Sequence, residues 1–182
     1  HVMGYLKGTM ERGLTWSAGG NACHGGPVLH GYVDSDFAGE MNSRRSTGGF
    51  VFFLGDNVIT WKSKCQPTVA LSTCEAEYVA ASWAVREAIA LRLQLHEMGF
   101  SQDAHPTRIF CDNQGTIEWC KNPVVMEKRK HIDVKRRMIE QAIERGVVEL
   151  VYVKSEDNIA DVFTKPVSKA AFLKCRQRLM GF

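Results

Sequence analysis

Four acidic residues lie where predicted elements of secondary structure begin or end. Asp112 directly follows the apolar run 108–111, and Asp34, Glu77 and Asp161 take comparable positions in three other segments. Open α/β folds bind ligands at the carboxyl ends of their strands, which is where these side chains would meet. Four carboxylates in one place would repel one another unless divalent cations held them together. The pattern therefore predicts a metal site with oxygen ligands.

Each of these acids, taken alone, has a simpler interpretation. Asp34 or Asp112 would serve as a turn residue at a strand end, and Glu77 as an exposed acid on a helix. Asp161 would be an acid at a helix start, where the helix dipole favours negative charge. For a single acid the simpler interpretation is preferred. Four acids at converging ends favour the metal site.

The elements that would position these acids follow from the spacing of apolar residues. Short connections imply that the first three strands form an antiparallel meander, and a helical crossover makes the fourth strand parallel to the first. The predicted fold class is α/β, a five-stranded mixed sheet of order 3-2-1-4-5 with helices on both faces. The strands are predicted at 29–37, 48–54, 58–62, 107–112 and 147–153, and the helices at 72–99, 114–120, 127–145, 157–164 and 168–180.

The helix predicted at 72–99 separates two neighbouring acids. Ser72 and Glu75 form a capping-box pattern at its start, which gives Glu75 a structural role. Glu77 lies two residues further on, about 200° around the helix axis. The two side chains therefore cannot share a face, and Glu77 is the better candidate for chemistry.

The composition indicates one globular domain. The chain has 182 residues, of which 45% are hydrophobic, enough for a sizeable core. Glycines concentrated in 17–27 predict a flexible linker, so 1–28 would precede a main domain at 29–182. The six cysteines form no C-x-x-C pair, which argues against zinc and for a reducing location. No signal peptide or long apolar span is present in the sequence, so no membrane partner is expected.

Basic residues are concentrated in one stretch. The net charge is only +3, so affinity for nucleic acid would depend on a local patch. Between Lys121 and Arg145 there are eight Lys or Arg residues against four Asp or Glu. The simpler interpretation of this stretch is a solvated helix face.

Seven motifs follow one another along the chain: GYVDSDFAG at 31–39, RRSTGG at 44–49, WKSKCQPTVALST at 61–73, EAEYVA at 75–80, CDNQ at 111–114, KHID at 130–133 and DNIADVFTKP at 157–166. In this order they resemble the ribonuclease H domain of a Ty1/copia-type LTR retrotransposon Pol polyprotein, a domain that lies C-terminal to the reverse transcriptase. The resemblance implies a ribonuclease H-like fold. It also implies that 1–28 is the tail of the reverse transcriptase or connection region plus a linker.

The resemblance implies a mechanism as well. Domains of this family hydrolyse the RNA strand of RNA/DNA hybrids with two Mg²⁺ ions, for which Mn²⁺ substitutes, and leave a 5′-phosphate and a 3′-hydroxyl. Asp34 would bridge the ions, Glu77 and Asp112 would hold the ion at the leaving group, and Asp161 would hold the ion that activates water. Asp36 and Glu75 also belong to the copia-type pattern, and their roles stay open.

One feature departs from related cellular enzymes, which often have a histidine in the loop after the fifth strand. Here that loop, 154–157, contains none. His131 follows a Lys-Arg-Lys run in a predicted helix, where it would contact phosphate or cap the helix. The general-acid step therefore has no assigned residue.

The implied substrate is an RNA/DNA hybrid, and the implied partner is the upstream reverse transcriptase domain. The expected location is the cytoplasm, inside a virus-like particle, or the nucleus. Trp61 and Trp119 are expected in the core rather than stacked on bases. The candidates for contacts to nucleic acid are Arg44, Arg45, Lys62, Lys64, Asn113, Lys128, Arg129 and Lys130.

Three alternatives remain open at this stage. A catalytically weak or inactive domain of the same fold would bind nucleic acid or act as a tether. Another carboxylate nuclease of the superfamily, such as an integrase or resolvase, would use similar ions on a different duplex. A protein-interaction domain would leave the acids at strand ends unexplained.

Overall fold

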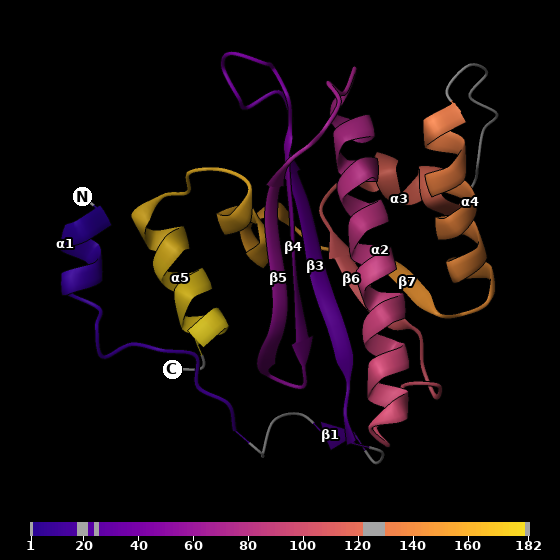
Figure 1. The fold of residues 1–182 in the computed structure, drawn as a ribbon, viewed down its shortest axis with the longest axis horizontal. Coiled ribbons are helices and arrows are strands. Elements are labelled where there is room, and N and C mark those ends of the chain that lie inside the picture. The colour runs from indigo at the N-terminus through magenta and orange to yellow at the C-terminus, as the bar shows by residue number, and fades with distance from the viewer. Residues whose placement is uncertain (1, 18–21, 24–25, 122–129, 181–182) are drawn as a thin grey trace.

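A five-stranded mixed sheet forms the centre of the computed structural model, which describes residues 2–17, 22–23, 26–121 and 130–180 (Figure 1). The strand order is β5-β4-β3-β6-β7, with the first three strands antiparallel and β6 and β7 parallel to β3. The predicted order and directions are confirmed. The strands are β3 (Leu29–Asp36), β4 (Thr47–Leu54), β5 (Asn57–Cys65), β6 (Thr107–Cys111) and β7 (Val148–Tyr152).

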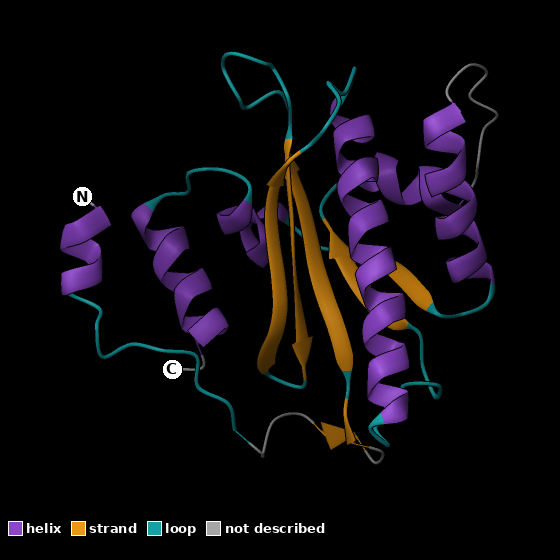
Figure 2. Cartoon of the chain, viewed as in Figure 1, coloured by secondary structure: helices purple, strands orange, loops and turns teal. Residues whose placement is uncertain are grey.

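Helices cover both faces of this sheet (Figure 2). One face holds α2 (Thr73–Glu97), with α3 (Gln114–Lys121) and α4 (Lys130–Glu144) beside it. The other face holds the 3₁₀ turns η1 (Ser155–Asp157) and η2 (Ile159–Phe163), and α5 (Lys169–Met180). Two elements were not predicted as such, a two-stranded sheet of β1 (Ala22–Cys23) and β2 (Gly26–Pro27), and the short helix α1 (Val2–Lys7).

The predicted helix at 157–164 is wrong in type. The segment forms two separate 3₁₀ turns, and Asn158 lies between them. The Asn158 side chain accepts a hydrogen bond from the Ala160 N–H and donates one to the Val33 carbonyl of β3. Because Asn158 ties the chain to the sheet and Pro166 prevents further helical bonds, the segment has no room for an α-helix.

The two sheet faces build two clusters of apolar side chains. Strand β4 contributes Phe50 and Phe52 to the larger cluster under α2, and Val51 and Phe53 to the smaller one under η2. A strand that is buried on both faces needs a continuous apolar run rather than an alternating one, which explains the sequence of β4. In the described residues no helix has the length and apolarity to cross a bilayer.

The long helix α2 begins as predicted at its N-cap. The Ser72 hydroxyl accepts a hydrogen bond from the Glu75 N–H at 3.1 Å. The Glu75 carboxylate accepts one from the Leu71 N–H at 2.8 Å, one residue before the position of an ideal capping box. Glu75 is therefore a structural residue at the helix start.

The first residues of the chain also touch the main sheet. The Trp16 indole donates to the Val58 carbonyl at 2.9 Å, and the Thr15 N–H donates to the Met180 carbonyl at 3.2 Å. The Tyr5 ring meets Phe172 of α5 edge-on at 5.8 Å. The domain boundary at residue 28 stays a prediction.

Candidate metal centre

Three of the predicted acids converge at one edge of the sheet. Asp34 is buried near the carboxyl end of β3, and Asp112 follows the adjacent parallel strand β6 in matching register. Asp161 approaches from η2, which Asn158 ties to β3. Carboxylate oxygens of Asp34, Asp112 and Asp161 all lie within 4.8 Å of one another.

Glu77 joins the cluster from the buried face of α2. Its side chain is 3% exposed, and its Oε1 accepts a hydrogen bond from the Ser35 N–H at 3.2 Å. Its Oε2 is buried and has no hydrogen-bond partner among the described residues. Ligand atoms of Glu77, Cys111 and Asp112 also lie within 4.8 Å of one another. Asp112 therefore belongs both to this group and to the group that it forms with Asp34 and Asp161.

Cys111 belongs to this second group by distance and not by chemistry. Burial raises the pKa of its thiol far above the ordinary value. A protonated thiol is a poor ligand, and the hard cations that carboxylates attract prefer oxygen. Cys111 is a small buried side chain at the end of β6, as expected from the sequence.

Burial and mutual repulsion disfavour negative charge on these acids. Burial, followed by the charges of Asp34 and Asp112, raises the pKa of Glu77 to about 9. Burial, followed by the charge of Asp34, raises the pKa of Asp161 to about 6. Burial also raises the pKa of Asp34, against the opposing effects of the Thr164 hydroxyl and Lys165. The folded chain therefore disfavours the ionised form of all three acids.

The residues present fit divalent metal ions. A buried carboxyl oxygen without a partner, together with carboxylates that repel one another, is stabilised by a cation with oxygen coordination. The donor set consists of carboxylates, which suit Mg²⁺ or Mn²⁺ better than softer metals. The structure thus offers an oxygen-rich site formed by four segments that are distant in the sequence.

Lys165 lies inside the cluster and was missed by the sequence analysis. Its Nζ is 3.1 Å from Asp161 Oδ1 and 3.6 Å from Asp34 Oδ2. The preceding Thr164 donates its hydroxyl hydrogen bond to Asp34 Oδ2. The i,i+4 spacing of Asp161 and Lys165 was a weak signal for this pair. Ser155, which donates a hydrogen bond to Asp112 Oδ2, had no recognisable signal.

A glycine lets the segment that carries Lys165 approach the sheet. A Cβ atom on Gly49 of β4 would lie 2.8 Å from Phe163 Cβ and 3.0 Å from Thr164 Cγ2. The first contact is shorter than Cβ atoms make in real structures and the second is unusually tight, so another residue at this position would push η2 outward. The position of Asp161 relative to Asp34 therefore depends on the missing side chain of Gly49.

Gln66 holds the strand and the helix that carry Asp34 and Glu77. Its side chain is fully buried, and its Nε2 donates to the Ala76 carbonyl at 2.8 Å and to Ser35 Oγ at 3.3 Å. Ser35 in turn holds Glu77 through its N–H. Gln66 is therefore a positioning residue that sequence patterning did not single out.

The other near-site candidates lie apart from the two carboxylate groups. Asp36 Oδ2 lies 1.9 Å from the place where a Cβ on Gly39 would be, so this carboxylate is turned toward the following loop. Glu75 caps α2, as described above. The side chain of His131 lies outside the described residues. Of these described acids, neither Asp36 nor Glu75 belongs to a group with metal-ligand spacing.

The predicted nucleic-acid contacts divide into several environments. Lys62 Nζ lies over the Trp83 ring at 5.2 Å, on the α2 face of the sheet. Lys64 and Arg44 are exposed, and Arg45 Nε donates to Ser43 Oγ at 3.0 Å. Asn113 Oδ1 accepts from the Thr116 N–H at 2.9 Å and caps α3. Lys128, Arg129 and the Lys130 side chain lie outside the described residues.

The expectation for the two tryptophans is half correct. Trp119 is partly buried and packs against the larger apolar cluster. Trp61 is 53% exposed, so its predicted place in the core is wrong. It lies on the edge strand β5, on the face opposite Lys62.

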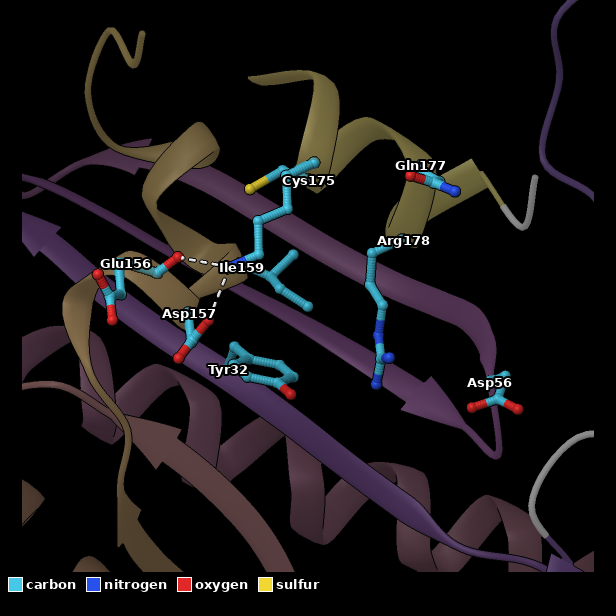
Figure 3. A pocket seen from close by; sticks show the side chains of 9 residues that line it. Tyr32, Asp56, Glu156, Asp157, Ile159, Cys175, Gln177 and Arg178 are labelled. Carbon is cyan, nitrogen blue, oxygen red and sulfur yellow. Dashed lines mark hydrogen bonds and ion pairs between the residues drawn. The ribbon is translucent and has the colours of Figure 1, made fainter. Parts of the chain in front are cut away.

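A hollow of about 640 Å³ lies on the α5 face of the sheet (Figure 3). Tyr32 and Arg178 extend into it. Lys174 and Asp157 also line it, and Lys174 Nζ donates to Asp157 Oδ1 at 2.7 Å. None of the four clustered acids lines this hollow. The hollow and the carboxylate cluster are therefore separate features. They lie on neighbouring parts of the sheet, because Tyr32 and Asp34 both belong to β3.

Curated relatives cover nearly the whole chain. The chain is 35% identical over 178 residues to the retrovirus-related Pol polyprotein from transposon TNT 1-94 of Nicotiana tabacum, a match of 97% of this chain and 13% of the relative. It is 36% identical over 171 residues to the Pol polyprotein from transposon RE2 of Arabidopsis thaliana, covering 94% of this chain and 11% of the relative. The chain thus spans only a small part of the length of these relatives. No protein-family profile matches it.

Solved structures show which fold this segment adopts. LC11-RNase H1, isolated from compost by a metagenomic approach, superposes with a TM-score of 0.56 at 17% identity, covering 76% of this chain and 93% of that one. The foamy viral protease-reverse transcriptase in complex with an RNA/DNA hybrid gives a TM-score of 0.53 at 14% identity, covering 84% of this chain and 21% of that one. By sequence the chain belongs with the copia-type retrotransposon Pol polyproteins, and the segment that it represents has the ribonuclease H fold.

Proposed function

We propose that the chain is an endoribonuclease that hydrolyses the RNA strand of RNA/DNA hybrids with two Mg²⁺ ions, for which Mn²⁺ substitutes. The observation that carries this proposal is the convergence of four acids in two groups that share Asp112, one of which contains Glu77 with its buried, unpartnered Oε2, within a ribonuclease H fold. The foamy viral relative of this fold was solved with a bound RNA/DNA hybrid, which supports the same substrate class here.

Each acid has a proposed place in the site. Glu77 and Asp112 would hold the ion at the leaving group, and Asp161 would hold the ion at the attacking water. Distances make Asp112 common to both groups, but the charge of Asp34 acts more strongly than that of Asp112 on both Glu77 and Asp161. Asp34 therefore remains the proposed ligand between the ions. When bound, two ions would activate the water and stabilise the leaving oxygen of the scissile phosphate.

The protein groups around the acids prepare them for this role. The Ser35 N–H fixes one oxygen of Glu77 and leaves the other buried without a hydrogen-bond partner among the described residues. The Ser155 and Thr164 hydroxyls orient Asp112 and Asp34 in the same way. Because groups of the chain itself make these contacts, they would hold the ligand oxygens in place before the hybrid arrives. The loop 154–157 supplies Ser155 and no histidine, so the proton donor to the leaving oxygen stays unassigned.

Substrate affinity would rest on phosphate contacts and fall steeply with salt concentration. Arg44 and Lys64 are exposed near the strand ends that lead to the cluster and are proposed to make such contacts. The reverse transcriptase part of the same polyprotein is the proposed partner, because the matching relatives are Pol polyproteins. A cytoplasmic location, within a virus-like particle, is the corresponding proposal for the cell.

The test is cleavage of an RNA/DNA hybrid labelled at one RNA end, in Mg²⁺, Mn²⁺ or EDTA. We expect metal-dependent cutting of the RNA strand alone, and loss of cutting in Asp112→Asn. Asp157→Asn is the matched control, because Asp157 is an exposed acid that pairs with Lys174 away from the cluster. Absence of cutting by the wild type in both metals, with hybrid binding intact, would support a binding or tether domain instead. Equal cutting of both strands of duplex DNA would point to another nuclease class.

A further inference from the structure

The carboxylate cluster contains a positively charged side chain, that of Lys165. Lys165 Nζ bridges Asp161 Oδ1 at 3.1 Å and Asp34 Oδ2 at 3.6 Å. We call this part of the cluster the lysine side. The other part, the glutamate side, is formed by Glu77 and Asp112. There the buried Glu77 Oε2 has no hydrogen-bond partner among the described residues.

Contacts of the backbone around Lys165 fix the position of this residue beside the cluster. The Lys165 N–H donates to the Asp161 carbonyl at 3.1 Å, which fixes the residue one turn after its partner acid. Thr164 is buried and bonded to Asp34, and Gly49 permits its close approach to the sheet. The Lys165 side chain itself is 35% exposed, so it retains a route to solvent.

The ammonium group and a metal ion would need the same space. An Mg²⁺ ion contacts carboxylate oxygens at about 2.0–2.1 Å, and an ammonium group is a compact point charge. Oxygens of Asp34 and Asp161 lie within 4.8 Å of each other, and the ammonium group already contacts both residues. A divalent ion placed against the same oxygens would be in close contact with Lys165, and the two cations would repel.

We propose that Lys165 is a built-in competitor for the metal ion on the lysine side of the cluster. It compensates Asp34 and Asp161 while no ion is bound, and it swings toward solvent when an ion takes its place. The glutamate side has no such competitor among the described residues, so it fills at lower metal concentration. This inference rests on the proposed function only in treating the cluster as a metal site.

The first measurement is calorimetric titration of Mg²⁺ and Mn²⁺ into the 182-residue chain without nucleic acid. Lys165→Met removes the charge and keeps most of the length of the side chain. We expect the weaker of two binding steps to tighten by about tenfold, which is about 1.4 kcal/mol. Lys165→Arg keeps the charge, and we expect it to retain the weak second step.

The second measurement is the unfolding temperature in EDTA. Loss of the internal cation leaves Asp34 and Asp161 uncompensated, so we expect Lys165→Met to unfold about 2–5 °C lower than the wild type. Tighter metal binding combined with a less stable metal-free domain is the signature of a competitor. A residue with a merely structural role would lower the unfolding temperature and leave metal affinity unchanged or weaker.

Two further variants make the outcome decisive. Lys174→Met removes a lysine paired with Asp157 outside the cluster, and we expect its metal affinity to equal that of the wild type. Lys165→Gln takes the place of Lys165→Met if the latter fails to fold. Unchanged or weaker affinity in the Lys165 variant overturns this inference and leaves the proposed nuclease intact. Absence of metal binding by the wild type overturns both.

Discussion

The glutamate side and the lysine side of the cluster solve the same electrostatic problem in different ways. Glu77 is 3% exposed and has a pKa of about 9, so its proton neutralises it when no metal ion is bound. Asp161 is more accessible and has a pKa of about 6, and Lys165 lies beside it. Without a metal ion, a bound proton therefore neutralises the glutamate side, and the ammonium group of Lys165 compensates the lysine side. Acids at one site therefore need not respond alike to metal, pH or mutation.

Loss of one ligand from each side should separate the two sides by activity. Glu77→Gln should reduce hybrid cleavage at least about 100-fold, because water cannot easily replace a ligand oxygen in a buried position. Asp161→Asn should reduce it by less, about tenfold, because water reaches this more exposed position and can complete the coordination. Single-turnover cleavage rates at saturating Mg²⁺ provide the measurement. Equal losses in the two variants would contradict the division of the cluster into two sides.

The next effect concerns the pH dependence of stability in EDTA. Both pKa values are raised by folding, so each acid stabilises the fold fully below its ordinary value and loses this contribution as pH rises. The contribution of Asp161 is lost between about 4 and 6, and that of Glu77 between 4.5 and about 9. The unfolding temperature of the metal-free domain should therefore fall from pH 5 to pH 9. Mg²⁺ should flatten this fall, because it stabilises the ionised acids.

Glu77→Gln is the control for this pH dependence. The amide cannot ionise, so the variant should lose the fall in unfolding temperature above pH 7 and exceed the wild type at pH 8 by about 3–8 °C in EDTA. With Mg²⁺ the order should reverse, because the variant has lost a ligand. A wild-type domain whose EDTA stability rises toward pH 9 would refute the assignment of a neutral, buried Glu77.

The smallest of these effects concerns the support behind the glutamate side. Gln66→Leu removes the hydrogen bonds to the Ala76 carbonyl and Ser35 Oγ and should cost about 1–3 kcal/mol of unfolding free energy. The cleavage rate of the folded enzyme should also fall several-fold, because Ser35 then holds Glu77 less firmly. Gln102→Leu is the matched control, since Gln102 binds the Leu29 N–H and the Pro27 carbonyl at the far end of β3. It should lower stability in urea unfolding and leave the cleavage rate of the folded enzyme unchanged.

Much of the fold could be predicted because local patterns determine it. Short connections required the β3–β4–β5 meander, and the long α2 crossover required β6 to lie parallel to β3. The meeting of Asp34 and Asp112 followed from that order. Patterning did not distinguish a short α-helix from two 3₁₀ turns at 155–163, because the difference depends on a bond from Asn158 to β3. Trp61 is exposed although its apolar neighbours in the sequence favoured the core, because its burial depends on what packs over an edge strand.

The supporting residues of the site were harder to predict than the acids. Acids at strand ends are conspicuous, but Gln66 resembles any polar residue after a Lys-rich edge strand. Its burial depends on the N-terminus of α2 lying over it. Lys165 looks like a solvated lysine before a proline until η2 turns it back toward Asp34. Long-range contacts of this kind appear only in three dimensions, and they decide how the acids behave.

Gly49 has a consequence for the evolution of this chain. It carries no functional group, yet its missing side chain sets how closely Thr164 and the residues around it approach β4. A single added methyl group would widen the gap that Asp34 and Asp161 must span. In a library of all single substitutions, Gly49 should therefore tolerate as little change as the acids themselves. Gly49, which has no functional group, would then be among the positions where amino-acid substitutions accumulate most slowly.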